Sequence, residues 1–193
     1  MWHRYDYSSR WSFFILRMHT TIHEFIIADI AIEIEKQLDN IAPAAGIKYL
    51  CSPSLELPAE DTDDEDGFGN AHGPNSVRNS PETRMPAAKY DIHDPDAAFG
   101  HPQDSYPGVV LEVVYSQKMK AMNYIAEEYI LGSHGSIRAV IALDLDYHRS
   151  KRVTLSVWRP EIVKDEDGSE RLVCELKVDG KVGLCLNLPC FHC

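Results

Sequence analysis

The sequence contains no hydrophobic run long enough to cross a membrane. Its apolar patch near the N-terminus, WSFFILRM, is shorter than a membrane span and is interrupted by Arg17. The residues before this patch lack the basic region and the cleavage site of a secretory signal. The chain has five cysteines, an odd number that does not suit a framework of paired disulfides. We therefore expect an intracellular protein, nuclear or cytoplasmic, with reduced thiols and no membrane association.

Basic residues are also scarce. The chain has 19 Lys and Arg against 30 Asp and Glu, which gives a formal net charge of -11. The acidity is concentrated in residues 56–66, where seven residues are acidic and none is basic. Because affinity for phosphates comes mainly from Lys and Arg, this balance counts against a nucleic-acid-binding enzyme without excluding one.

Several motifs of enzyme chemistry are missing as well. The sequence has no GxSxG nucleophile elbow, no glycine-rich phosphate loop and no Cys/His dyad. Four soft metal ligands fall within the last nine residues, namely Cys185, Cys190, His192 and Cys193. Their spacing matches no standard zinc finger and no second ligand pair closes the site, so an incidental tail is favoured over a zinc site.

The composition fits a single globular domain. The 193 residues are 44% hydrophobic and 25% charged, which is ordinary for a soluble protein of this size. Residues 52–86 are acidic, rich in Pro, Gly, Ser and Asn, and poor in large apolar residues, a composition typical of disorder. We expect a disordered leader over residues 1–19, one domain over residues 20–180 with the acidic insertion 52–86 inside it, and a tail over residues 181–193.

Hydrophobic periodicity predicts both helices and strands. Apolar residues at spacings of three and four predict an amphipathic helix over residues 23–41 and a second over residues 117–131, which ends at Gly132. Dense or alternating β-branched residues predict strands over residues 107–117, 137–145, 151–159 and 171–178, with shorter strands near 47–51 and 87–99. The expected fold class is α/β, with a central mixed sheet flanked by the two helices and a C-terminal strand extension.

The strand over residues 107–117 carries the residue that most needs an explanation. Its sequence, PGVVLEVVYSQ, is too rich in Val for a surface strand, yet it contains a carboxylate, Glu112. A buried carboxylate is costly unless a cation or hydrogen-bond donors satisfy it. One interpretation is a structural ion pair of Glu112 with Arg138 or a lysine. The other is that Glu112 binds a metal ion.

Asp96 is the second ligand in the metal interpretation. It lies beside a predicted short strand, and two carboxylates on neighbouring strands that face one end of a sheet can hold a hard cation such as Mg²⁺ or Mn²⁺. Such a cation can polarise a phosphate and activate water. Alternatively, Asp96 caps a turn after Pro95. On the first helix, Glu24 and Glu35 lie near the edge of the apolar stripe, whereas His23 is expected to hydrogen-bond locally.

Five short motifs follow one another between residues 90 and 160. PDAAF contains Asp96 and PGVVLEVVYSQ contains Glu112; they are followed by YILGS, IALDLDY and TLSVWRP. In order and spacing this series resembles the PD-(D/E)XK superfamily of restriction endonuclease-like folds, and in particular a group of uncharacterised fungal proteins. The resemblance implies a restriction endonuclease-like core. It also implies a Mg²⁺-dependent or Mn²⁺-dependent nuclease that hydrolyses phosphodiester bonds in DNA or RNA.

The resemblance assigns roles to individual residues. It makes Asp96 and Glu112 the catalytic carboxylates and metal ligands, with Glu24 or Glu35 of the first helix as a third acidic ligand. The motif lysine, two residues after the glutamate, is replaced by Val114.

Gln117 is the substitute that the fungal group places after this strand. A glutamine can position water but carries no positive charge, and Lys118 and Lys120 lie close to it in sequence. Loss of a charge-stabilising donor typically costs about 10²–10³ in rate. Two functions therefore remain open: a slow metal-dependent nuclease, or a catalytically inactive descendant that acts as a protein-interaction module.

Overall fold

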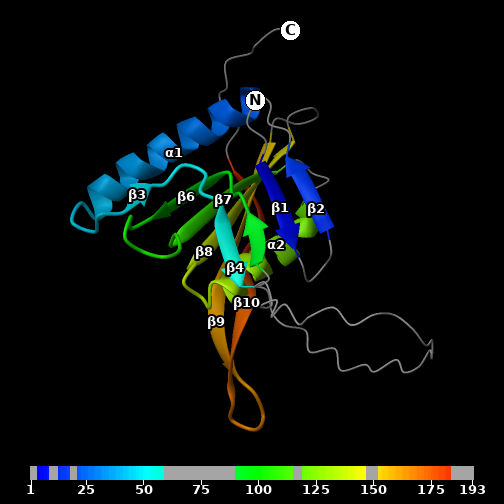
Figure 1. The fold of residues 1–193 in the computed structure, drawn as a ribbon. Helices are drawn as coiled ribbons and strands as arrows, with labels where there is room; N and C mark the ends of the chain where they lie inside the picture. Colours follow the sequence, from blue (N-terminus) through cyan, green and yellow to red (C-terminus); the bar gives the residue numbers. More distant parts are fainter. Residues whose placement is uncertain are drawn as a thin grey trace, which may run out of the picture.

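A computed structural model gives the fold of the chain (Figure 1). It describes residues 4–8, 13–17, 21–58, 90–114, 119–146 and 152–183. The helices in these residues are α1 (Thr21–Ile41) and α2 (Met119–Gly132). The strands are β1 (Arg4–Ser8), β2 (Phe13–Arg17), β3 (Lys48–Tyr49), β4 (Leu55–Pro58), β5 (Tyr90–His93), β6 (Ala97–Gly100), β7 (Val109–Val114), β8 (Ala139–Asp146), β9 (Arg152–Lys164) and β10 (Glu170–Gly183).

The larger of two sheets is mixed. Its six strands lie in the order β10-β9-β8-β7-β6-β3. Neighbouring strands run antiparallel except β7 and β8, which are parallel and are connected through α2. A parallel pair needs a crossover of this kind, because a tight turn can join only antiparallel strands. The prediction of an α/β fold with a mixed sheet and two helices is confirmed.

The two helices cover opposite faces of this sheet. Along β7, Val110 and Val114 are buried in one apolar cluster with residues of α2, whereas Leu111 and Val113 are buried in another with residues of α1. Successive side chains of a strand point to opposite faces, so this alternation places the helices on the two sides. The unusually apolar sequence of β7 follows from the burial of both of its faces.

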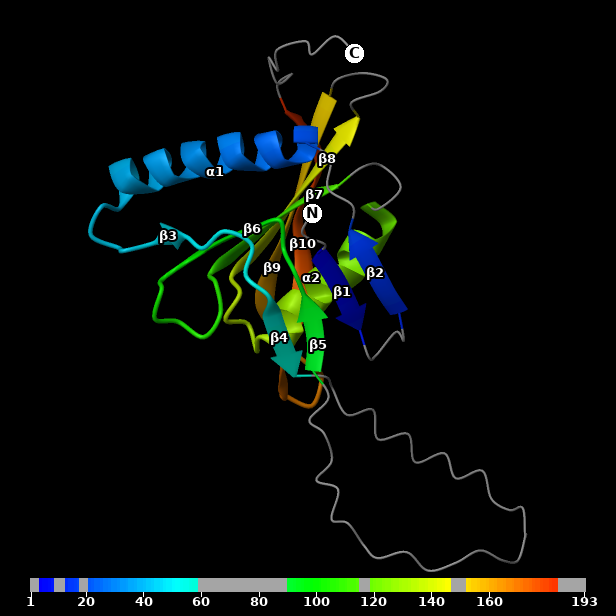
Figure 2. The ribbon, with the colours of Figure 1, turned by 45° about the horizontal axis from the view of Figure 1, so that its top comes forward.

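The smaller sheet lies on the other side of α2. Its four strands are antiparallel, in the order β2-β1-β5-β4. Leu55 and Leu57 of β4 are buried in the same cluster as Tyr129 of α2. The layers therefore follow the order α1, six-stranded sheet, α2 and four-stranded sheet (Figure 2).

The helices and the main strands lie close to where the sequence predicts them. α1, α2, β7 and β8 differ from the predicted ranges by a few residues at their ends. β9 and β10 are longer than predicted and form a hairpin that projects from the rest of the molecule (Figure 1).

Two segments that were expected to lack regular structure contain strands. β1 and β2 fall within the predicted leader, and β4 falls within the predicted acidic insertion. β1 and β4 both pair with β5, a partner distant in sequence from each of them. Residues 59–89 and 184–193, which hold the rest of the insertion and the cysteine-rich tail, lie outside the described residues. Neither α1 nor α2 is long and apolar enough to span a membrane.

Candidate functional site

Asp96 lies where the chain passes from one sheet to the other. β5 of the smaller sheet ends at His93, and β6 of the larger sheet begins at Ala97. The described pairing of β6 with β7 begins at Ala97, opposite Leu111, so the ladder stops before Val113. The Asp96 carboxylate takes the place of a backbone acceptor there, because its Oδ2 accepts a hydrogen bond of 2.7 Å from the Val113 amide. Asp96 is 1% exposed.

His23, in the first turn of α1, completes this arrangement. Its Nε2 is 3.2 Å from the carbonyl oxygen of Val113 and 3.3 Å from Oδ2 of Asp96. Burial by itself lowers the pKa of His23, but the hydrogen bond and charge of Asp96, helped by the Val113 carbonyl and by Glu24, raise the pKa above its ordinary value. The two side chains together satisfy both backbone groups of Val113 beyond the end of the ladder. The hydrogen bonding expected of His23 was local, but its partner Val113 lies 90 positions away in sequence.

Glu112 lies in the middle of β7 and faces the opposite helix. It alternates with Leu111 and Val113, so its side chain is on the α2 side of the sheet. There the Tyr129 hydroxyl donates a hydrogen bond of 2.8 Å to Oε1 of Glu112, which is 1% exposed. Arg138, the cation proposed from sequence as its structural partner, instead donates to the carbonyl of Gly135 at 3.4 Å. The need for a donor was predicted, but Tyr129 was not named as one. A lysine partner stays a prediction, because Lys118 and the side chain of Lys120 lie outside the described residues.

Asp96 and Glu112 belong to neighbouring strand segments, but their carboxylates contact different helices. Asp96 contacts the start of α1 through His23, whereas Glu112 contacts α2 through Tyr129. Their oxygen atoms suit a hard cation in chemical type. In the part of the chain that the structure describes, however, no three His, Cys, Asp or Glu side chains are grouped so that they could hold a metal ion. Within those residues, then, no third acidic side chain is grouped with Asp96 and Glu112.

The remaining predicted site residues are dispersed. Glu24 is about half exposed, and its Oε1 lies 3.8 Å from Nδ1 of His23, the ring nitrogen that does not face Asp96. Glu35 accepts a hydrogen bond of 3.1 Å from the Tyr49 amide of β3, three helical turns further along α1. Gln117 and Lys118 lie outside the described residues, as does the side chain of Lys120.

Sequence reasoning missed a second buried polar cluster, between the smaller sheet and α2. His93 of β5 and Asp6 of β1 are 0% exposed, and Glu128 of α2 is 8% exposed. Nδ1 of His93 is 3.7 Å from Oδ1 of Asp6, and its Nε2 is 3.1 Å from Oε2 of Glu128. The Ser8 hydroxyl donates to the other oxygen of Glu128. Neither ring nitrogen has an aligned hydrogen bond to a described residue, although each lies within 4 Å of a carboxylate oxygen.

The charges around His93 fix its protonation. Burial alone lowers the pKa of His93, but the contacts and charges of Asp6 and Glu128 outweigh burial and raise the pKa to about 9. The imidazolium therefore links β1, β5 and α2 at neutral pH. Its enclosure suits a structural role, because no solvent or substrate reaches a fully buried ring. The only local sign of this cluster in the sequence was a histidine at an inward position of a short strand. Its acidic partners Asp6 and Glu128 lie 87 and 35 residues away in sequence.

Comparisons with protein-family models, with curated proteins and with solved structures found no match to this chain.

Proposed function

We propose that this chain is a nuclease-like domain in which the motif carboxylates Asp96 and Glu112 serve the fold, and that it acts by binding a protein partner. The observation that carries this proposal is the pair of protein groups at the two motif positions: His23 lies against Asp96, and Tyr129 donates to Glu112. Both carboxylates are 1% exposed. A Mg²⁺ site keeps several waters and admits a phosphate, which requires open space beside the ligands.

The position of the motif lysine supports the same proposal. Val114 replaces this lysine and is 4% exposed, in the apolar cluster that includes Met122 and Tyr129 of α2. Val114 packs there among apolar side chains and supplies no cation to the neighbouring Glu112, which faces the same helix. The local packing therefore favours an apolar side chain where the nuclease chemistry needs a cation.

The second candidate is hydrolysis of phosphodiester bonds in DNA or RNA with Mg²⁺ or Mn²⁺. It is favoured by the order of the elements: Asp96 directly precedes β6, Glu112 lies on the neighbouring antiparallel strand β7, and α2 and the parallel strand β8 follow. This is the order that the resemblance implies. In this candidate Gln117 would orient the attacking water.

A cleavage assay separates the two candidates. Supercoiled plasmid, single-stranded DNA and RNA are incubated with the purified full chain and Mg²⁺ or Mn²⁺, beside Asp96→Asn, Glu112→Gln and the control Glu33→Gln, an exposed carboxylate of α1. We expect no cleavage above background in any of the four proteins, and no rise in melting temperature on addition of either metal. Cleavage by the parent and by Glu33→Gln that is lost in both site variants would contradict the proposal and establish the nuclease.

A further inference from the structure

A groove runs between α2 and the outermost strand of the larger sheet, where Figure 2 shows β10 beside α2. Its volume is about 480 Å³. One wall consists of Asn123, Glu127 and Leu131, which lie one turn apart on α2, and the other of Leu172, Cys174 and Leu176, alternate residues of β10. Trp158 of β9 lines the groove as well, and its Nε1 donates a hydrogen bond of 3.0 Å to Oδ1 of Asn123.

The strand beside the groove is at the edge of the sheet. β10 is the last strand in the order, and it pairs with β9 without interruption from Glu170 to Leu176; the irregularities in the pairing begin beyond Leu176. The hairpin begins with a hydrogen bond of 2.9 Å from the Asp165 amide to the Ser169 carbonyl. Hydrogen-bonded and non-hydrogen-bonded pairs alternate from there. The backbone N–H and C=O groups of Leu172 and Cys174 therefore point away from β9, toward the open edge.

The groove carries an acidic side chain that the described residues do not neutralise. No described lysine or arginine forms an ion pair with Glu127, whereas the groove's Arg171 lies 3.8 Å from Asp165. Burial, and to a smaller extent the charge of Glu127, raises the pKa of Cys174 to about 11, so its thiol is neutral. The groove is thus lined by apolar side chains together with Asn123, Arg171 and Glu127. Glu127 has no ion pair with a described residue, so a complementary ligand brings apolar groups and a cation that meets Glu127.

We propose that an extended segment of a protein partner adds to the edge of β10, with aliphatic side chains in the groove and a lysine or arginine opposite Glu127. The main-chain groups at Leu172 and Cys174 supply the hydrogen bonds of an added strand, and the groove receives every second side chain. This inference rests on the proposed function of partner binding, for which it supplies the surface and the chemistry of the partner.

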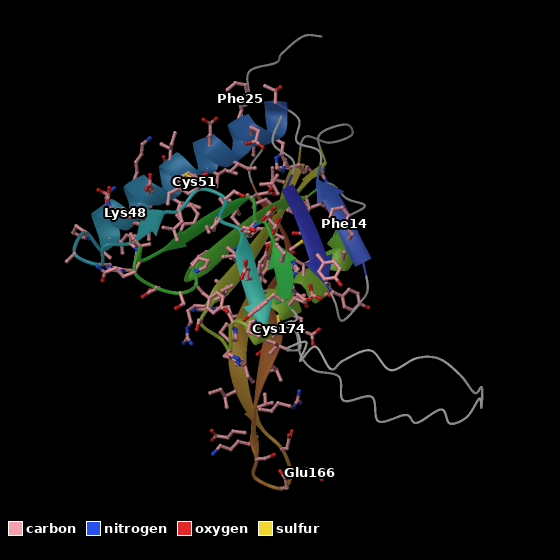
Figure 3. The ribbon with its side chains drawn as sticks, in the orientation of Figure 1. Phe14, Phe25, Lys48, Cys51, Glu166 and Cys174 are labelled. Carbon is pink, nitrogen blue, oxygen red and sulfur yellow. The ribbon has the colours of Figure 1, made fainter. Side chains whose placement is uncertain are left out.

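Selection of linear peptides from a random displayed library tests this surface on the purified full chain. Enriched peptides are synthesised, and their Kd is measured by fluorescence polarisation. Leu172→Pro removes one amide that faces the open edge and leaves the ladder with β9 intact. Glu127→Lys reverses the charge in the groove. Glu166→Lys makes the same charge change at the far tip of the hairpin, away from Cys174 (Figure 3), and is the control.

We expect enriched peptides to alternate aliphatic residues and to contain a lysine or arginine. Each groove variant should weaken their binding by about tenfold or more, and Glu166→Lys should leave it within about twofold. Peptides that bind all variants equally would overturn this surface while leaving the binding function in place. Failure to enrich any peptide would also overturn it. The proposed function is tested separately, because metal-dependent cleavage in the assay described above would contradict it.

Discussion

The buried imidazolium of His93 makes the stability of the fold depend on pH. A group whose pKa is raised by folding stabilises the native state fully below its unfolded pKa, and that stabilisation is lost as the pH rises toward the folded pKa. For His93 the ordinary value is 6.5 and the folded value is about 9. The free energy of unfolding should therefore fall between pH 6.5 and pH 9.

The size of this fall follows from the difference between the two values. One pKa unit corresponds to about 1.4 kcal/mol, so the interval from 6.5 to about 9 corresponds to a loss on the order of 3 kcal/mol. A typical domain is stable by about 5–15 kcal/mol, so this loss is a large share of the total. His23 adds a loss in the same direction, since its pKa is also raised. Measurements end at pH 9, because deprotonation of the unfolded Cys174 thiol adds a further loss above that pH.

Urea unfolding of the full chain at a series of pH values measures this effect. His93→Gln keeps a polar side chain at the position but does not titrate, so the difference between the two proteins isolates His93 from His23. We expect the parent to lose more stability than His93→Gln between pH 6.5 and pH 9, by an amount on the order of 3 kcal/mol. Equal losses in the two proteins would refute the assignment of a charged, buried His93.

Two further substitutions test the packing around the candidate site. Tyr129→Phe removes a donor to the buried carboxylate of Glu112. It should lower the free energy of unfolding, measured by calorimetry, by about 1.5–3 kcal/mol. Tyr90→Phe, at an exposed tyrosine, is the control, and equal effects of the two substitutions would argue against this hydrogen bond. Gly100→Ala places a Cβ 2.9 Å from Cα of Pro107 and should cost about 1–3 kcal/mol. Among the described residues, the Cβ of Gly108→Ala meets only Phe99 O, at 3.8 Å, so a cost as large as that of Gly100→Ala would contradict the close approach.

The parts of the fold that the sequence predicts are those whose burial follows from local pattern. β7 is buried on both faces, so its sequence is a nearly continuous apolar run. α2 follows this strand, has one apolar face and ends at Gly132. β4 shows the limit of this reasoning. Its LELP sequence lies within an acidic stretch, yet Leu57 is 1% exposed because it is buried in the cluster that contains Tyr129 of α2. Composition averaged over a window does not reveal such a strand.

The candidate site was predictable in position but not in contacts. The motif order places Asp96 and Glu112 on neighbouring strand segments, as the structure does. Which group meets each carboxylate depends on the helices, because His23 belongs to α1 and Tyr129 to α2. The sequence offers no local sign of either contact. The cluster around His93 was out of reach for the same reason, since Asp6 lies in the predicted leader, far from His93 and Glu128 in sequence.

The hydrogen bond from Ser8 to Glu128 joins residues 120 positions apart. During synthesis, β1 emerges long before β5 and α2, so it cannot make these contacts until α2 has been synthesised. Closure of so large a loop costs entropy before any contact compensates it, and contacts of this kind slow folding. We therefore expect the smaller sheet to assemble late, on a preformed layer of α2 and the larger sheet. Until then the apolar surface of α2 beneath it is exposed, and it is there that a nascent chain would need protection from aggregation.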